Sequence, residues 1–177
     1  MYIIMDASHI ENVSIEGENR LFDKWVLWAH LPHDTDWSLE SYRNIMEIQT
    51  IPEMVALYKI LPEKIVKNCM LFLMRKGVIP MWEDKKNRNG GCFSYKIPNK
   101  NVFNVWKLAS YSLTGETLSI TEIMANHING ITISPKKSFC IIKIWMDSCE
   151  YQNTDEINPK NGLLPRGCIF KKHKPEY

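Results

Sequence analysis

The sequence predicts an α+β fold with a largely antiparallel sheet and its helices on one face. Two observations lead to this prediction. Short segments with strand periodicity are joined by tight turns, and separate segments between them carry the start and stop signals of helices. The 177 residues, 45% of them hydrophobic and 24% charged, suffice for one domain with a core of its own.

The first elements follow a short N-terminal segment. We expect a loosely ordered leader over residues 1–20 and a single domain over residues 21–177. From Asp23 onward, both alternating sets of residues include large apolar side chains, which predicts a strand covered on both faces. A polar, turn-rich stretch at residues 32–36 then places Trp37 in a loop.

A capping box marks the start of the first helix. Thr50 and Glu53 have the required spacing, and Pro52 fits the first turn. Apolar residues recur at helical spacing at positions 51, 54, 55 and 58, and Pro62 marks the end. A buried strand over residues 69–74 follows, closed by a turn at residues 76–77.

The second half of the chain alternates strands and helices. We expect a strand over residues 92–97 after the turn Asn89-Gly90-Gly91, and a helix over residues 102–114 with Gly115 as its C-cap. A third helix begins at Ser119, with a capping box to Glu122, and stops at Asn129-Gly130. The last expected strands cover residues 131–135, 139–146 and 168–171.

Several classes of protein are excluded by composition and motifs. The net charge is only +2, which argues against a broad nucleic-acid-binding or membrane-binding surface. The longest apolar run has six residues, whereas a spanning helix needs about 20. No nucleophile, phosphate-loop, zinc or dinucleotide motif is present, and the five cysteines lack metal or disulfide spacing. We expect a cytoplasmic protein with no catalytic residues, no metal and no cofactor.

Two of the six tryptophans point to a binding site. Trp25, Trp28 and Trp106 lie among apolar residues at the right period and are expected in the core. Trp37 and Trp82 lie in polar loops instead, where two facing indoles could sandwich a flat, electron-poor or cationic ring. Glu83, directly after the second indole, could accept hydrogen bonds from the edge of a guanine-like base.

Residues 80–91 also carry a resemblance to a known family. Their sequence, PMWEDKKNRNGG, resembles the signature loop of the cap-binding subunit of the eukaryotic translation initiation complex. Supporting matches span residues 20–170 in the same order, among them residues 25–28, 113–116, 144–145 and 162–165. The resemblance implies a curved antiparallel sheet, with a cap-binding slot on its concave face and about three helices on its convex face.

The resemblance also implies roles for individual residues. Trp37 and Trp82 would stack on the two faces of 7-methylguanine, Glu83 would accept two hydrogen bonds from its edge, and Trp145 would contact the N-methyl group. Of the three basic positions that hold the phosphates in the family, one holds Lys136, while the others hold Cys92 and Ile141. Strand alternation places Ile141, Lys143 and Trp145 on one face, so Lys143 is a second candidate phosphate contact.

The same family presents a convex apolar surface to a Tyr-x-x-x-x-Leu-hydrophobic helix of a scaffold or regulatory protein. The matching positions here are occupied by Ile51, Val55, Lys107, Tyr111 and Gly115, with Thr114 at a further second-helix position. Val55 stands where a tryptophan usually anchors that contact, which predicts a partner with a modified motif.

We therefore expect a monomeric, non-enzymatic protein that binds 5′-capped messenger RNA in translation initiation, with no DNA or membrane partner. The alternative is a cap-binding repressor or decoy, with the same pocket but without productive recruitment of the scaffold. A cap-processing enzyme is a remote third, because motifs for a metal or a nucleophile are missing.

Overall fold

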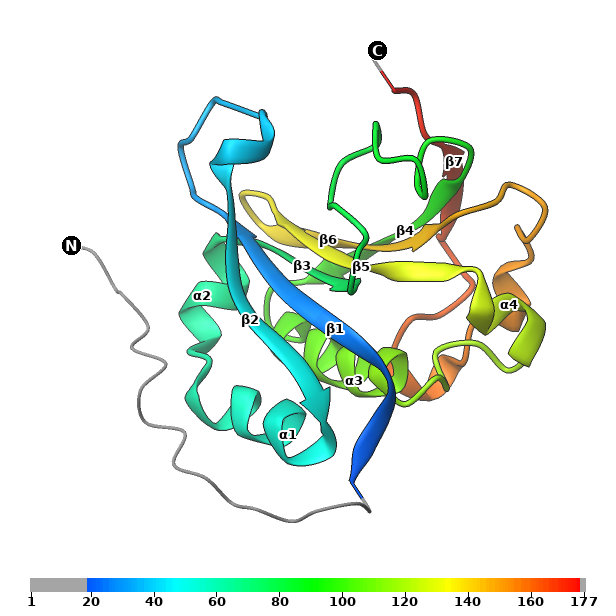
Figure 1. Cartoon of the computed structure of the whole chain (residues 1–177), viewed down its shortest axis with the longest axis horizontal. Helices are drawn as coiled ribbons and strands as arrows, with labels where there is room; N and C mark the ends of the chain where they lie inside the picture. The colour runs from blue at the N-terminus through cyan, green and yellow to red at the C-terminus, as the bar shows by residue number, and fades with distance from the viewer. Residues whose placement is uncertain (1–18, 176–177) are drawn as a thin grey trace.

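The computed structural model describes residues 19–175 and contains one seven-stranded sheet in the order β2-β1-β3-β5-β6-β4-β7 (Figure 1). Every neighbouring pair is antiparallel. The first 18 positions of the expected leader lie outside the described residues, and Arg20 already belongs to the first strand. The strands are β1 (Arg20–His30), β2 (Tyr42–Thr50), β3 (Met70–Arg75), β4 (Gly91–Pro98), β5 (Ile128–Pro135), β6 (Phe139–Met146) and β7 (Ile169–Lys172).

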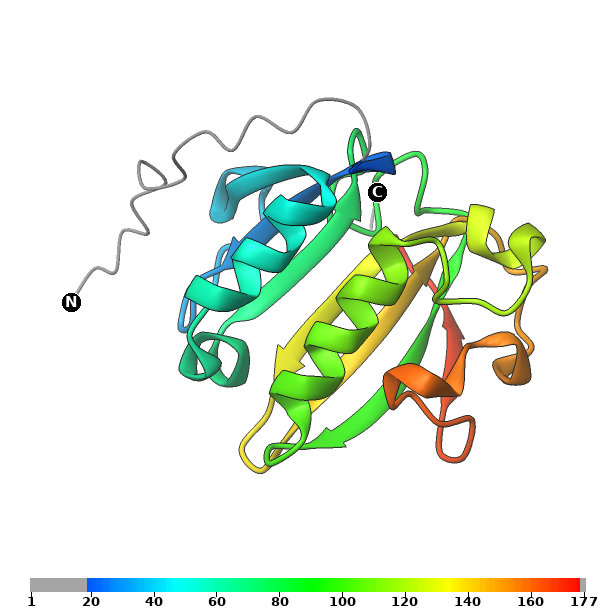
Figure 2. The same cartoon turned by 90° about the horizontal axis from the view of Figure 1, so that it is seen from below.

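Helices cover one face of this curved sheet, and two long loops rise from the other (Figures 1 and 2). The predicted α+β class is confirmed, with α1 and α3 lying side by side beneath the strands. The helices are α1 (Ile51–Ile60), α2 (Glu63–Asn68), α3 (Val102–Thr114) and α4 (Glu122–Asn126), with short 3-10 turns η2 (Leu39–Ser41), η3 (Thr154–Glu156) and η4 (Pro159–Asn161).

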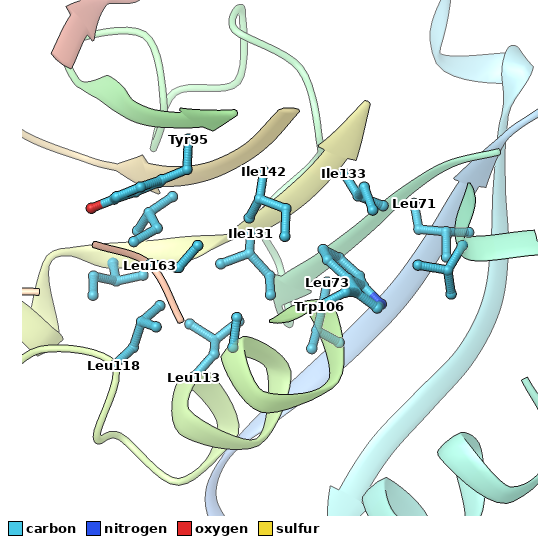
Figure 3. Close-up of a cluster of buried hydrophobic side chains, with 14 of the residues drawn as sticks. Leu71, Leu73, Tyr95, Trp106, Leu113, Leu118, Ile131, Ile133, Ile142 and Leu163 are labelled. Carbon is cyan, nitrogen blue, oxygen red and sulfur yellow. The ribbon is translucent and has the colours of Figure 1, made fainter. Parts of the chain in front are cut away.

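The main core fills the space between the sheet and α3 (Figure 3). In β3, Leu71 and Leu73 point into this core, while Phe72 and Met74 belong to a second apolar cluster on the opposite face. Alternation along a strand explains the division, because successive side chains point to opposite faces. Trp25 and Trp106 are fully buried in the main core, as predicted. Trp28 packs against the second cluster.

The first helix begins at the predicted capping box. The Thr50 hydroxyl accepts a hydrogen bond from the Glu53 amide at 3.3 Å, and the Glu53 carboxylate accepts one from the Thr50 amide at 2.9 Å. Met54 and Leu57 form the buried stripe, so the predicted apolar positions 51 and 55 lie outside it and are exposed. Pro62 ends α1 but also begins α2, a helix that the sequence analysis missed.

The second of the predicted helices corresponds to α3, which has the predicted bounds and is followed by Gly115. However, Gly115 has a φ of −88°, and the left-handed residue is Glu116, with a φ of 55°. The Glu116 carboxylate accepts hydrogen bonds from both terminal nitrogens of Arg75, at 2.8 and 2.6 Å. Glu116 thus makes this ion pair from a backbone conformation that glycine would adopt more readily.

The third predicted helix needs correction. α4 covers only Glu122–Asn126, and the expected capping box from Ser119 to Glu122 is wrong. The Ser119 hydroxyl instead accepts from the Thr121 amide at 3.1 Å and donates to the Glu156 carbonyl at 3.1 Å. Asn129 and Gly130 do not stop a helix, because both lie inside β5. A Cβ on Gly130 would come within 2.4 Å of the Leu73 carbonyl oxygen, so the close strand approach requires glycine.

The remaining strands agree with the prediction to within a few residues, except β2, which was not predicted at all. All five cysteines are free thiols. Between residues 19 and 175, no helix is long and apolar enough to cross a membrane, and no cluster of His, Cys, Asp or Glu side chains could hold a metal ion.

Candidate functional site

A cavity of about 400 Å³ opens on the face of the sheet opposite the helices. Its walls come from two loops, which we call the Trp37 loop (residues 31–38) and the Trp82 loop (residues 76–90), and its floor comes from the strands. The lining side chains are Trp37, Tyr42, Met70, Phe72, Pro80, Met81, Trp82, Glu83, Thr132, Lys143 and Trp145. The cavity therefore contains five of the six residues predicted for ligand binding.

The Trp37 loop is held by hydrogen bonds around Asp36. The Asp36 carboxylate accepts from the Ser38 amide and hydroxyl, both at 2.8 Å, and these bonds lower the pKa of that carboxyl. The Asp36 carbonyl accepts from Nε2 of His30, at the end of β1, at 2.7 Å. The His30 ring stacks on Trp37 at a centroid distance of 4.0 Å and an interplanar angle of 8°. Although its side chain is 51% exposed, Trp37 is thus supported on one face.

The Trp82 loop is stabilised by Asp84 and Asn87. The Asp84 carboxylate accepts from the backbone amides of Ile79 at 3.1 Å and Lys86 at 2.7 Å. The buried Asn87 side chain donates to the carbonyls of Ile79 and Met81, at 2.8 and 2.9 Å. These bonds fix the backbone on both sides of Trp82, which is 36% exposed at the cavity wall.

Glu83 and Asp84 differ in what their carboxylates do. Glu83 lines the cavity, whereas Asp84 does not line it and binds the backbone of its own loop. Of the two carboxylates, Glu83 is therefore the one placed to meet a ligand in the cavity.

A histidine that was not among the predicted site residues lies beside two tryptophans of the cavity. His173 follows β7, is only 2% exposed, and stacks on Trp82 at 5.8 Å and 13°. Its ring also contacts Trp145, at 4.9 Å and a tilt of 53°. Burial lowers the pKa of His173, and the Lys143 ammonium lowers it further, against opposing effects of its hydrogen bond to Asn87 and of Glu83.

The cavity floor includes residues that the sequence analysis did not single out, namely Tyr42, Met70, Phe72 and Thr132. Thr132 could have been found from the hairpin of β5 and β6, because it pairs directly with Lys143. Two buried polar atoms of the floor, the Trp145 indole nitrogen and the Thr132 hydroxyl, have no hydrogen-bond partner within the described chain. A buried polar atom without a partner costs free energy, so this part of the floor is not satisfied by the described residues themselves.

The predicted cations separate into two groups. Lys143 lines the cavity, with its Nζ 5.7 Å from the Trp82 ring centroid. Lys136 is exposed beyond the end of β5 and does not line the cavity. It lies four residues past Thr132 along the hairpin, about 13 Å at the usual rise of a strand.

Cys92 replaces a family cation with a neutral group. It pairs with Trp145 on one side and with Lys171 of β7 on the other. Burial raises the pKa of the Cys92 thiol, although Lys143 and Lys171 act to lower it. Residues paired across a sheet share a face, so Lys171 lies on the cavity face near Lys143. Lys171 was not among the predicted phosphate contacts, which were Lys136 and Lys143.

The residues predicted for a protein partner lie on the helical face. Ile51 and Val55 of α1 are exposed, as is Gly115, while Lys107 and Tyr111 of α3 are half-buried. Thr114, expected on the same surface, is buried and donates a hydrogen bond to the Ser110 carbonyl at 3.1 Å. It therefore does not belong to the surface.

Comparisons with known proteins support a single family. Residues 20–163 match the family model described as eukaryotic initiation factor 4E. An initiation factor 4E homolog of Acanthamoeba polyphaga mimivirus is 44% identical over 62 residues, which cover 35% of this chain and 23% of that protein. Initiation factor 4E-2 of Schizosaccharomyces pombe is 29% identical over 150 residues, covering 79% and 57%. The chain thus matches less than two thirds of the length of either relative.

Among solved structures, the fold resembles that of C. elegans eIF4E-3, determined in complex with the 4E-binding protein Mextli and a cap analog. The TM-score is 0.72 at 17% sequence identity, and the match covers 91% of this chain and 99% of that one. This likeness establishes a shared fold.

Proposed function

The chain belongs to the eukaryotic initiation factor 4E family, and on this premise we propose that its cavity binds the 7-methylguanosine cap of messenger RNA in translation initiation. The observation that carries the proposal is the meeting of Trp37 and Trp82 with Glu83 in one cavity, although the two indoles come from separate loops. The C. elegans neighbour, solved with a cap analog, has the same fold.

The chemistry of the cavity suits a cationic purine. Methylation at N7 gives the guanine ring a positive charge, and an indole face attracts such a ring by about 0.5–1 kcal/mol when exposed and about 2 kcal/mol when desolvated. Stacking adds about 1–3 kcal/mol for each base–aromatic pair. Unmethylated guanine would keep the stacking contribution and lose the cation–π contribution, so the two indoles would select the methylated base.

The polar edge of the base would be read by Glu83, whose carboxylate accepts hydrogen bonds from two base N–H groups. The Trp82 backbone amide would donate to the base carbonyl, and Trp145 would contact the methyl group. The Trp145 indole nitrogen and the Thr132 hydroxyl, buried and unpaired within the described chain, would gain a polar partner only if ligand binding exposes them.

Phosphate binding would depend mainly on Lys143. Its ammonium lies over the Trp82 ring, the position that a cationic base would take, and we expect it to swing toward the phosphates when the base stacks. Lys171 would assist from the neighbouring strand. Lys136, at the distal end of the hairpin, would contact only the far end of the phosphate chain or the next nucleotide.

The protein acts in this proposal as a binding factor and not as an enzyme. Its helical face, with Ile51 and Val55 exposed, would bind a scaffold or regulatory protein. The 4E-binding protein in the C. elegans complex supports a partner of this class. Recruitment of a scaffold would make the chain an activator, and failure to recruit one would make it a repressor or decoy.

Calorimetric titration with 7-methyl-GTP tests the site. We expect Trp37→Leu and Trp82→Leu each to lose most of the binding, because each removes one stacking face. Phe22→Leu is the matched control, because Phe22 is an exposed aromatic residue of β1 that does not line the cavity. Unchanged affinity in both tryptophan variants would remove the proposal.

A further inference from the structure

Each of the two cavity tryptophans is backed by a histidine. His30 stacks on Trp37 at 4.0 Å and 8°, and His173 stacks on Trp82 at 5.8 Å and 13°. Both imidazoles are 2% exposed, and neither lines the cavity. Each ring therefore packs against its indole from outside the cavity, which leaves the other indole face toward a ligand.

Each histidine is also hydrogen-bonded to the loop that carries its tryptophan. His30 Nε2 donates to the Asp36 carbonyl at 2.7 Å, one residue before Trp37. His173 Nδ1 donates to the Asn87 carbonyl of the Trp82 loop at 2.8 Å, and its backbone amide donates to the Gly90 carbonyl at 3.0 Å. Because a carbonyl oxygen only accepts, these bonds fix which ring nitrogen carries the proton.

We propose that His30 and His173 are positioning residues that hold the two indoles for stacking on the cap, and that His173 must be uncharged to do so. The inference rests on the proposed function and deepens it. Loop tryptophans with exposed faces would otherwise sample several rotamers, and ordering them would reduce the binding free energy. Buried rings that are themselves fixed by hydrogen bonds remove that cost in advance.

The charge requirement follows from electrostatics. A protonated His173 would place a positive charge behind the indole whose front face receives a cationic base, and two like charges across one ring repel. The charged groups that act on His173 are Lys143 of β6, which opposes protonation, and Glu83 of the Trp82 loop, which favours it. The carboxylate of Asp36 is the charged group near His30.

The direction of the pH effect is set by burial. Burial lowers the pKa of His173 from its ordinary value of 6.5, so the ring is neutral at neutral pH. As the pH falls, protonation would weaken binding of the methylated base, and by reciprocity the bound base would resist protonation of the ring. GTP, whose base carries no fixed charge, would show the other pH effects on binding without this repulsion.

Paired substitutions separate the ring from the hydrogen bond. His173→Asn keeps a donor near the Nδ1 position and removes the ring, whereas His173→Phe keeps a ring and removes both the donor and the titration. For His30, whose donor is Nε2, His30→Gln keeps a donor near that position and removes the ring, and His30→Phe keeps a ring and removes the donor. His127→Asn is the control: His127 also stacks, on Tyr151 at 4.2 Å, and binds Asp147 through Nδ1, but it does not line or back the cavity.

The experiment measures dissociation constants for 7-methyl-GTP and GTP from about pH 7.5 to about pH 5.5, the range in which imidazole groups titrate. We expect His173→Asn and His30→Gln to bind about three- to tenfold more weakly at the upper pH, the worth of an aromatic pair. His173→Phe should bind more tightly than His173→Asn. Its preference for 7-methyl-GTP over GTP should change less with pH than that of the native chain. His127→Asn should match the native chain in both respects.

Native-strength binding by both ring-removing variants, or the same pH dependence in His173→Phe as in the native chain, would overturn this inference alone. No binding by the native chain would overturn the proposed function, and this inference with it.

If a variant fails to fold, imidazole NMR signals of the native chain test the inference instead. 7-Methyl-GTP should shift the signals of His30 and His173 and leave that of His127 in place. Unshifted signals of His30 and His173 would overturn the inference.

Discussion

At the scale of residues, the adjacent carboxylates of Glu83 and Asp84 lie in different environments. Glu83 lines the cavity, and Asp84 accepts hydrogen bonds from two backbone amides of its own loop. Their substitution should therefore affect different properties of the protein, binding in one case and stability in the other.

The first prediction compares Glu83→Ala with Asp84→Ala. Glu83→Ala should weaken cap binding by about 1–3 kcal/mol, because base N–H donors would be left unpaired, and should leave the fold intact. Asp84→Ala should lower the free energy of unfolding by a similar amount, about 1–3 kcal/mol, because two amides lose a charged acceptor. Calorimetry and urea denaturation measure the two quantities.

Glu40→Ala is the control for both, since Glu40 is an exposed carboxylate outside the cavity. If Asp84→Ala were the variant that lost binding at unchanged stability, the alignment of the loop would be wrong by one residue.

At the scale of elements, the start of α1 and the start of α4 allow a matched comparison. The capping box of Thr50 and Glu53 is formed, while the similar pattern of Ser119 and Glu122 is not. The sequence pattern is the same in both places. The difference arises from tertiary contacts, because the Ser119 hydroxyl is engaged with the segment around Glu156.

The second prediction follows from that difference. Glu53→Ala should lower the free energy of unfolding by about 0.5–2 kcal/mol, the usual worth of a cap. Glu122→Ala should change it by less than about 0.5 kcal/mol, as for surface positions without such a role. Thermal and urea unfolding of the two variants measure this, and equal losses would show that the α1 box adds nothing specific.

The third prediction concerns the outer surface of α1 and α3. Val55, 39% exposed, stands where the family has an aromatic anchor, and aromatic anchors commonly contribute at least about 2 kcal/mol. A standard Tyr-x-x-x-x-Leu-hydrophobic peptide should therefore bind the native chain weakly, and Val55→Trp should strengthen that binding. Calorimetric titration of the peptide measures both.

Ile123→Trp on α4 is the control, because it adds an exposed tryptophan to a different helix. Tight binding of the standard peptide by the native chain would contradict the prediction, as would equal gains in the two variants.

At the scale of the whole molecule, the small net charge and the loss of two family cations limit electrostatic binding. The net charge is +2, and Cys92 and Ile141 stand at positions that the family fills with basic residues. Lys143 and Lys171 remain on the cavity face. Phosphate affinity should therefore depend on few charges.

The fourth prediction is a shallow dependence of cap affinity on salt. Each lysine that contacts phosphate contributes about one unit to the slope of log affinity against log salt. Lys143→Ala should reduce the slope more than Lys136→Ala, and Lys171→Ala should have an intermediate effect. Lys59→Ala, on the exposed end of α1, is the control. A steep slope that survives loss of Lys143 and Lys171 would place the phosphates elsewhere.

The whole molecule also shows where sequence reasoning succeeds and fails. The bounds of α3 and the position of the Trp82 loop follow from local signals, namely helical periodicity and Gly-rich turns. β2 was missed because it is an edge strand with only Ile48 fully buried, so its residues lack a clear alternation. α2 was missed because Pro62, interpreted as a stop, also begins a new helix.

Local signals also explain why only part of the site was predicted. Trp37, Trp82 and Glu83 were recognisable because an aromatic residue in a polar loop is unusual locally. His173 was not recognisable, because it lies in a run of lysines and becomes buried only when β7 pairs with β4 and brings it beneath the Trp82 loop. Its role depends on contacts between segments more than eighty residues apart.

The central claim is that two indoles of this cavity bind a cationic guanine, and the most direct test is tryptophan fluorescence of the native chain titrated with 7-methyl-GTP and with GTP. Trp37 and Trp82 are the two exposed tryptophans of the described chain, so stacking on them should quench the emission. The account predicts saturable quenching by both ligands, with 7-methyl-GTP binding at least about tenfold more tightly because only it gains the cation–π attraction of two indoles. Equal affinity for the two ligands, or no quenching by 7-methyl-GTP, would contradict it.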